Sequence, residues 1–261
     1  MVMDFSDIRD IVINGTDCVV DVTRGDDETC RFVSAKEKYF NVTADGGVLT
    51  VKQKKATIFY RLIIKKFEFK LVLPKSFCGK LRFRNKNGGL YISDASFADV
   101  DLYTKNGKFD INNIKCAQFA LKMRNGSVAV KNTTASGDVY IKCCNGNVKT
   151  ESLTVPALTI SCKNTELSAI DIIAGKFDCT THNGSIDASA LDSSDIKIET
   201  SNGKIDALCI GSRNDFRLTL ETAHGAINVD GAPSKNLAET NGAKKRLSCK
   251  TSNGDIDLKF V

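Results

Sequence analysis

The chain has no tryptophan, three prolines and only two histidines among its 261 residues. His182 and His224 are far apart in the sequence, and each stands next to a predicted turn. So few imidazole groups argue against a histidine-activated nucleophile or a multi-histidine metal site. No Gly-x-Ser-x-Gly, phosphate-loop or dinucleotide-binding pattern is present either. The sequence therefore predicts no catalytic residue, no cofactor and no metal.

The chain also lacks a long hydrophobic run and a recognisable export signal. No segment approaches the ~18 consecutive apolar residues of a membrane helix. The opening MVMDFSDIRD is acidic and has neither the basic nor the apolar region of a secretory signal. Ten cysteines without such a signal favour a reducing compartment. We therefore expect a cytoplasmic or membrane-associated protein, or a cell-surface protein if a signal precedes this sequence.

What the sequence does contain is a repeated Asn-Gly pair. The repeat is marked by Asn87, Asn106, Asn125, Asn145, Asn164, Asn183, Asn202 and Asn253, with Thr replacing Gly at the fifth, and by His224-Gly225. These positions are almost evenly spaced along the chain, and only the last two intervals are clearly longer. Internal repetition at a fixed period indicates stacked structural units. The sequence predicts nine such units.

Apolar and polar residues alternate on both sides of each turn. Around Asn106, for example, Val100, Leu102, Phe109 and Ile111 are apolar and their neighbours are mostly polar. Alternation with a period of two is typical of a strand with one buried face. The chain is therefore predicted to be all-β.

Two arrangements would satisfy this pattern. Asn-Gly between alternating strands is the usual mark of an antiparallel hairpin meander. Stacked coils explain in addition why the spacing stays nearly constant and why each column keeps its residue type. Parallel crossovers are strongly biased to one hand. We therefore predict a single-stranded parallel, right-handed β-helix, or solenoid, of ~19-residue coils.

The coils are expected to form one structural unit with the residues that precede them. Residues 1–86 alternate without the repeat and are predicted to form an N-terminal β layer that caps the solenoid and continues into it. Residues 87–261 hold the repeats, with an inserted loop at about 231–246. The closing SNGDIDLKFV is predicted to form the last, ninth level.

The repeated asparagines are predicted to be structural. Asn tolerates left-handed backbone conformations, and Gly prefers them at corners. Stacked Asn side chains can also hydrogen-bond to one another along the column. The sequence therefore predicts an Asn ladder at Asn87, Asn106, Asn125, Asn145, Asn164, Asn183, Asn202 and Asn253.

Several phrases in order, DGGVLTVKQ, FKLVLP, NGGLYI, TSNGKIDA and TSNGDIDL, extend over nearly the whole chain. In these phrases the sequence resembles the bacterial putative-adhesin family, a β-helix domain of unknown function. The resemblance implies a repetitive β-helix that is often associated with cell surfaces or membranes. It supplies no catalytic residues.

Positive charge is concentrated in the first third of the chain. Residues 1–86 hold 17 basic and 11 acidic side chains, whereas residues 87–261 hold 20 of each. Basic residues also precede the turns of the early repeats. A solvated face whose lysines discourage edge pairing would explain them, but so would a binding face. The candidate residues are Lys65, Lys66, Lys86, Lys105, Lys122, Arg124, Lys142 and Lys163.

Such a face fits an anionic surface, either membrane headgroups or an acidic glycan. A membrane-associated protein is a further candidate partner, for which the 231–246 loop is a possible docking point. The sequence contains no specific nucleic-acid-binding motif. The predicted function is thus a non-enzymatic β-helical scaffold or interaction module.

Two acidic residues supply the alternative function. Asp187 and Asp206 fall one repeat apart, which would place them about 5 Å apart on neighbouring strands. A carboxylate pair at this spacing suits a retaining glycosidase or a calcium ion. A polar exterior beside a glycine turn explains the same residues. The alternative is therefore a carbohydrate-active enzyme.

Cys143 and Cys162 occupy a column in which other repeats place threonine. No Cys-x-x-Cys pair accompanies them, so metal binding is not indicated. A disulfide between them would need specific geometry. We predict that they are small inward-facing side chains.

Overall fold

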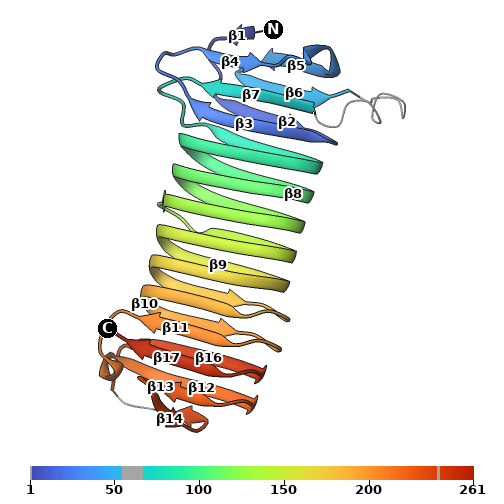
Figure 1. Ribbon diagram of the computed structural model, residues 1–261. Helices are drawn as coiled ribbons and strands as arrows, with labels where there is room; N and C mark the ends of the chain where they lie inside the picture. The colour runs from blue at the N-terminus through green and yellow to red at the C-terminus, as the bar shows by residue number, and fades with distance from the viewer. Residues whose placement is uncertain (1, 55–66, 240–241) are drawn as a thin grey trace. The chain divides into compact units, whose positions relative to one another are not determined.

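The computed structural model describes residues 2–54, 67–239 and 242–261, and these are almost entirely β-strand (Figure 1). The chain divides into two compact units, residues 1–130 (unit 1) and 131–261 (unit 2). This strand content confirms the all-β prediction. Most of the strand pairs are parallel. Within the described ranges, no helical segment has the length and apolar character of a membrane span.

The elements are β1 (Val2–Phe5), β2 (Asp10–Asn14), β3 (Cys18–Arg24), β4 (Cys30–Val33), η1 (Glu37–Tyr39), β5 (Phe40–Asp45), β6 (Val48–Gln53), β7 (Phe67–Leu73), β8 (Lys80–Ala135), β9 (Val139–Thr180), β10 (Ile186–Glu199), β11 (Ile205–Cys209), η2 (Arg213–Asp215), β12 (Phe216–His224), β13 (Ile227–Val229), β14 (Ala232–Ser234), β15 (Leu237–Ala238), β16 (Lys245–Asn253) and β17 (Ile256–Phe260).

Unit 1 mixes parallel and antiparallel pairing. β2 lies between β6 and β8, and β3 pairs with both β7 and β8, all in parallel. β4 pairs antiparallel with β1 and β7, and β5 pairs antiparallel with β6. The alternation of β7 buries Phe67, Phe69, Leu71 and Leu73 on one face. This apolar face forms the core together with β3 and β4.

The Asn-Gly pairs of β8 have a packing role as well as a turn role. Gly126 has a φ of 134°, in the region that favours glycine. A Cβ atom at Gly126 would lie 1.8 Å from the carbonyl oxygen of Gly107, on the preceding repeat. Glycine is therefore required because the neighbouring backbone approaches too closely for any side chain.

A second column of corners has a mixed sequence. Left-handed backbone occurs at Asp94 and Asn113 in unit 1, and the Nδ2 group of Asn113 donates a hydrogen bond of 2.6 Å to Asp94 Oδ1. In unit 2 it occurs at Asn132, Ser152, Asp171 and Ala190. These positions recur at nearly the same interval as the repeated asparagines, but no single residue type occupies all of them. The sequence pattern therefore did not predict this corner.

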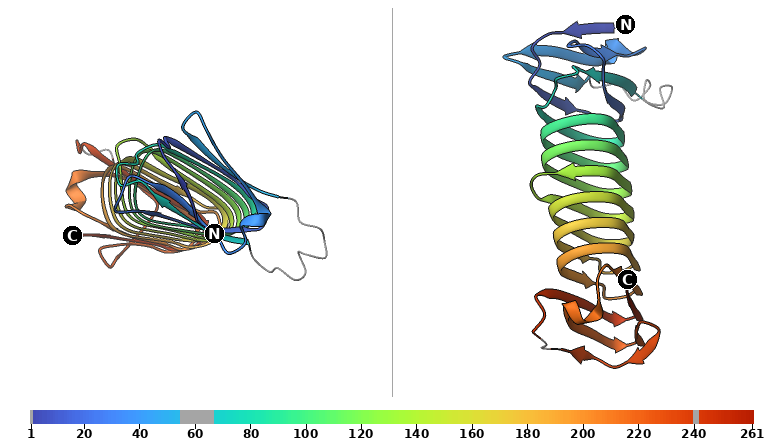
Figure 2. Two further views of the ribbon diagram at one scale, coloured as in Figure 1. Left: turned by 90° about the horizontal axis from the view of Figure 1, so that it is seen from above. Right: turned by 90° about the vertical axis from the view of Figure 1, so that its left-hand side faces the viewer.

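The order of strands in unit 2 differs from their order in the chain. β10 pairs in parallel with β16, and β16 pairs on its other side with β12. Likewise, β17 lies between β11 and β13. In both side views the red C-terminal strands lie between orange strands (Figures 1 and 2). The predicted position of SNGDIDLKFV as the last level is therefore wrong.

The similarity of the two stretches ETSNGKIDA and KTSNGDIDL has a direct physical reason, because they are neighbours. Asn253 Nδ2 donates a hydrogen bond of 2.7 Å to Asn202 Oδ1, although the two residues are far apart in the sequence. The C-terminal strands bury Leu247, Cys249, Ile256 and Leu258. β14 and β15 pair antiparallel with β13 and β12. We call β16 and β17 the inserted strands.

Candidate functional site

Four of the predicted basic residues lie in unit 1, and we call Lys86, Lys105, Lys122 and Arg124 the basic column. Lys86, Lys122 and Arg124 are exposed, and Lys105 is partly exposed. Lys86, Lys105 and Arg124 each directly precede an asparagine of the repeat. Those asparagines are joined by side-chain hydrogen bonds, so the three cations occupy successive levels, about 4.8 Å apart.

The asparagine side chains hold one another along the stack. In unit 1, Asn106 donates to Asn87 at 2.8 Å and Asn125 donates to Asn106 at 2.7 Å. Asn87 Nδ2 in turn donates to Asp17 Oδ1 at 2.7 Å. In unit 2, bonds of 2.6–2.8 Å run from Asn145 through Asn164, Asn183 and Asn202 to Asn253. Each of these bonds occupies an amide group within the stack, so the ladder itself offers little to a ligand.

The side chains of the basic column differ from nearby basic side chains in whether they form ion pairs. Among the described residues, none of its four members forms an ion pair. By contrast, Lys108 Nζ lies 2.7 Å from Asp110 Oδ2, and Arg84 pairs with Asp101. Uncompensated cations at regular spacing create a positive potential over this part of the surface.

The other predicted basic residues are not part of the basic column. Lys65 and Lys66 lie outside the residues that the structure describes. Lys142 and Lys163 belong to unit 2, where both are exposed. The backbone carbonyl of Lys163 accepts hydrogen bonds from the N–H groups of His182 and Asn183.

One member of the predicted carboxylate pair, Asp206, is part of an ion-pair network. Asp187 and Asp206 are register partners on β10 and β11. Lys204 Nζ lies 2.9 Å from Asp206 Oδ1 and 2.6 Å from Asp257 Oδ2 on the inserted strand β17. A hydrogen bond from Lys204 makes the largest contribution to lowering the pKa of Asp257, and a hydrogen bond from Asn228 makes the next largest. Sequence reasoning missed Lys204 because its partner Asp257 comes from a strand much later in the chain.

The ion pair between Lys204 and Asp206 bears on the predicted glycosidase and calcium functions. A retaining glycosidase needs one carboxylate as a nucleophile and one as an acid. Here Lys204 holds Asp206 and Asp257 together, which favours structural pairing. In the part of the chain that the structure describes, no group of three or more His, Cys, Asp or Glu side chains could hold a metal ion.

The cysteines are free thiols, and most are buried. Cys143 and Cys162 are both buried, and burial raises the pKa of Cys162 to about 12 and raises that of Cys143 as well. Because the thiolate is the reactive form, a raised pKa makes these groups inert near neutral pH. Cys78 is exposed and Cys144 is intermediate.

This burial predicts a simple labelling pattern. A thiol reagent such as iodoacetamide at pH 8 is expected to modify Cys78 and Cys144 in the native protein and all ten cysteines after unfolding in guanidinium. Peptide mass spectrometry reads out both states. Rapid native labelling of Cys162 or Cys249 would contradict the burial of these columns.

Comparison with known proteins identifies the family. Residues 8–259 match the family described as Toastrack DUF4097. The chain belongs to the Toastrack DUF4097 family. The match covers both units of this Toastrack chain, and the predicted resemblance to the putative-adhesin family is confirmed. No curated protein is a significant match.

Two solved structures are similar to this Toastrack protein. A "putative lipid binding protein" from Parabacteroides distasonis is 13% identical, with a TM-score of 0.51, and the alignment covers 100% of this chain and 96% of that one. A "putative adhesin" from Bacteroides fragilis is 12% identical, with a TM-score of 0.49 and the same coverage. At such identities the first match shows a shared fold. Neither name is that of an enzyme.

Proposed function

We propose that this protein is a non-enzymatic β-helical interaction module of the adhesin type, and that its basic column binds an anionic phospholipid surface. The observation that carries the proposal is the set of exposed or partly exposed cations at successive levels of unit 1, which have no ion-pair partners among the described residues. Each lysine or arginine near an anionic bilayer adds a similar increment of attraction, so a row of them acts together.

Support for the scaffold part of the proposal comes from the strand register. In unit 2, Leu167 pairs with Ile186, and Ile186 pairs with Ile205, each one repeat further on. The Asn ladder bonds have the same separation in both units. We propose a coil of ~19 residues wound with the right-handed bias of parallel crossovers. Such a winding would give each column a straight, rigid row of side chains.

An exposed aromatic residue favours lipid over other anionic partners. Tyr103 is 41% exposed and stands three residues before Asn106, the position that Lys122 occupies in the next repeat. Tyrosine rings are enriched at the headgroup level of membranes, where one end of the ring is apolar and the other is wet. A flat β surface with Lys, Arg and Tyr suits a bilayer better than it suits an enclosed ligand.

Vesicle sedimentation tests this function. At low salt, the protein is expected to bind vesicles of phosphatidylcholine and phosphatidylserine but not phosphatidylcholine alone, and to dissociate at high salt. The triple variant K86Q/K105Q/R124Q is expected to bind about a hundredfold more weakly, because each basic residue near the surface contributes about 1 kcal/mol of binding free energy. K149Q/K197Q/K250Q is the matched control, because it removes three charges that are already paired with Glu151, Glu199 and Glu221.

Three results would overturn the proposal. Absence of vesicle binding at low salt would remove it. Equal losses for the two triple variants would show that net charge, and not the basic column, determines binding. Binding to heparin without binding to vesicles would replace lipid with an acidic glycan.

A further inference from the structure

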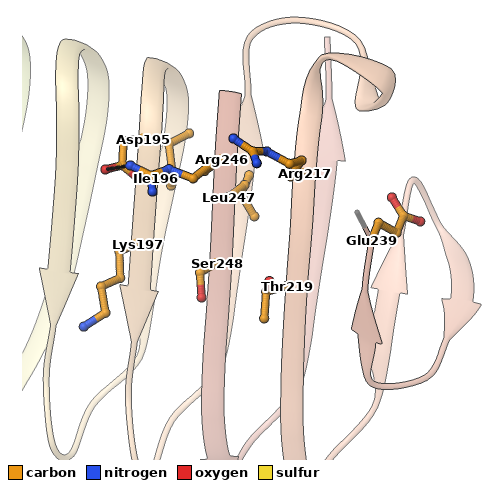
Figure 3. Close-up of a pocket in the computed structure, with 9 residues that line it drawn as sticks. All are labelled: Asp195, Ile196, Lys197, Arg217, Thr219, Glu239, Arg246, Leu247 and Ser248. Atoms are coloured by element: carbon orange, nitrogen blue, oxygen red, sulfur yellow. Dashed lines mark hydrogen bonds and ion pairs between the residues drawn. The ribbon is translucent and has the colours of Figure 1, made fainter. Parts of the chain in front are cut away.

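A hollow on the sheet face of unit 2 has no role in the proposed function. It has a volume of about 400 Å³ and lies over β10, β16 and β12, with Glu239, the residue after β15, at its edge (Figure 3). This volume falls in the range of small-molecule sites. The residues that matter for its chemistry are Asp195, Arg246, Arg217, Ser248, Thr219 and Glu239.

Two arginines occupy adjacent positions on neighbouring strands in this hollow. Arg217 on β12 and Arg246 on β16 are direct register partners. Like charges at directly opposite positions destabilise a sheet. In Figure 3 both side chains extend the same way across the face, Arg246 toward Asp195 and Arg217 over β16. The pair therefore concentrates positive charge at one point of the surface.

The two arginines differ in their acidic partners. Arg246 Nη2 lies 3.1 Å from Asp195 Oδ2. The second carboxylate of the hollow, Glu239, is held by Arg213 at 2.7 Å. Among the residues that the structure describes, Arg217 forms no ion pair. The hollow therefore contains an exposed guanidinium group, while the two carboxylates that line the hollow are each paired with another arginine.

The inserted strands create this imbalance. If the coils were stacked in chain order, β12 would lie beside β10, and Arg217 would face Asp195. Because β16 lies between them, Asp195 pairs with Arg246 instead. The strand order thus separates Arg217 from the carboxylate that would otherwise neutralise it.

Two hydroxyl groups lie further along the same face. Thr219 and Ser248 are register partners two residues beyond the arginines. In the described part of the chain, neither side-chain hydroxyl forms a hydrogen bond. Both line the hollow. They can donate to or accept from the hydroxyl groups of a ligand.

We propose that this hollow binds a tetrahedral oxyanion, a phosphate or sulfate ester, on a small hydroxylated carrier such as a monosaccharide. Planar guanidinium groups match tetrahedral oxyanions through paired N–H donors. Arg217 and Arg246 would hold the oxyanion, and Ser248 and Thr219 would contact the carrier. The site is in unit 2, and it does not depend on the basic column of unit 1.

Titration calorimetry at low ionic strength tests the site with inorganic phosphate, inorganic sulfate, glucose 6-phosphate and glucose. Glucose 6-phosphate is expected to bind most tightly, the inorganic anions more weakly, and glucose not at all. R217Q is expected to weaken binding at least about tenfold, the usual loss for a hydrogen bond to a charged group. D195N is expected to strengthen it severalfold, because it frees Arg246. K176Q is the matched control, since Lys176 lies on the far side of Asp195 from Arg246.

The opposite effects of R217Q and D195N separate a binding site from a folding defect. No binding of any oxyanion by the unmodified protein would overturn the proposal, as would unchanged binding by R217Q. Vesicle binding by R217Q is expected to stay unchanged. A loss of vesicle binding in R217Q without a loss of glucose 6-phosphate binding would assign Arg217 to the lipid surface instead.

Discussion

A chain that ends at Lys244 is expected to lose the native structure of β10–β13, even though it removes only the last two strands of the sequence. The inserted strands bury Leu247, Cys249, Ile256 and Leu258 between β10–β11 and β12–β13. Each buried aliphatic side chain contributes roughly 1.5–3 kcal/mol. Their combined loss approaches the roughly 5–15 kcal/mol that stabilises a typical domain.

Hydrogen exchange measured by mass spectrometry distinguishes this result from simple shortening. We expect loss of protection in β10, β11, β12 and β13, with protection in unit 1 retained. The control is K259A, which changes an exposed side chain of β17 and keeps both strands. If β10–β13 stayed fully protected in the truncated chain, β12–β13 would have to pair directly with β10–β11. That outcome would contradict the separating role of the inserted strands.

Replacing Gly254 by alanine is expected to lower the free energy of unfolding by about 3 kcal/mol, the upper range for forced overpacking. A Cβ atom there would lie 2.0 Å from the carbonyl oxygen of Gly203. The obstacle is backbone, which cannot rotate away as a flexible side chain could. The strand would have to move away from its neighbour and weaken the Asn202–Asn253 hydrogen bond.

Gly242 supplies the matched control for this substitution. A Cβ atom at Gly242 would meet nothing within 4 Å. G242A is therefore expected to change the stability by less than about 0.5 kcal/mol. Urea unfolding followed by circular dichroism measures both variants. Equal stabilities of G254A and G242A would show that the turn between β16 and β17 does not stack closely on the turn that contains Gly203.

Much of this fold could be predicted from the sequence because the repeat makes a strong local pattern. Alternation identified buried side chains such as Val100, Leu102, Phe109 and Ile111, all of which lie in the core. The family resemblance rested on the same repeated phrases, and the family match confirms it. Local periodicity thus determined the secondary structure and the side of each strand that is buried.

The order of the strands could not be predicted, because every repeat carries nearly the same columns. Ile205, Ile227 and Ile256 are equivalent in the pattern, so each could neighbour either of the others. Two features of the sequence are consistent with the observed strand order. The stretches around Asn202 and Asn253 are more alike than either is to the stretch around His224, and the interval before Asn253 is the longest. A longer connection can carry the chain back past one pair of strands.

The candidate sites depend on that order to different degrees. The basic column follows from adjacent repeats, so its residues could be named from the sequence. Arg217 could not, because its missing partner is a consequence of β16 lying between β12 and β10. The bridging role of Lys204 has the same origin. Sites made by non-sequential neighbours leave no local pattern in the chain.

The most direct test of the strand order is a nuclear Overhauser measurement on protein labelled only at isoleucine δ1 methyl groups. Single Ile→Val variants assign Ile205, Ile227 and Ile256, all of which are buried. The register places Ile256 beside both Ile205 and Ile227, and places those two a further level apart, roughly 10 Å. We expect strong cross-peaks from Ile256 to each of the others and a much weaker one, or none, between Ile205 and Ile227. A strong Ile205–Ile227 cross-peak without one between Ile205 and Ile256 would contradict the insertion of the C-terminal strands.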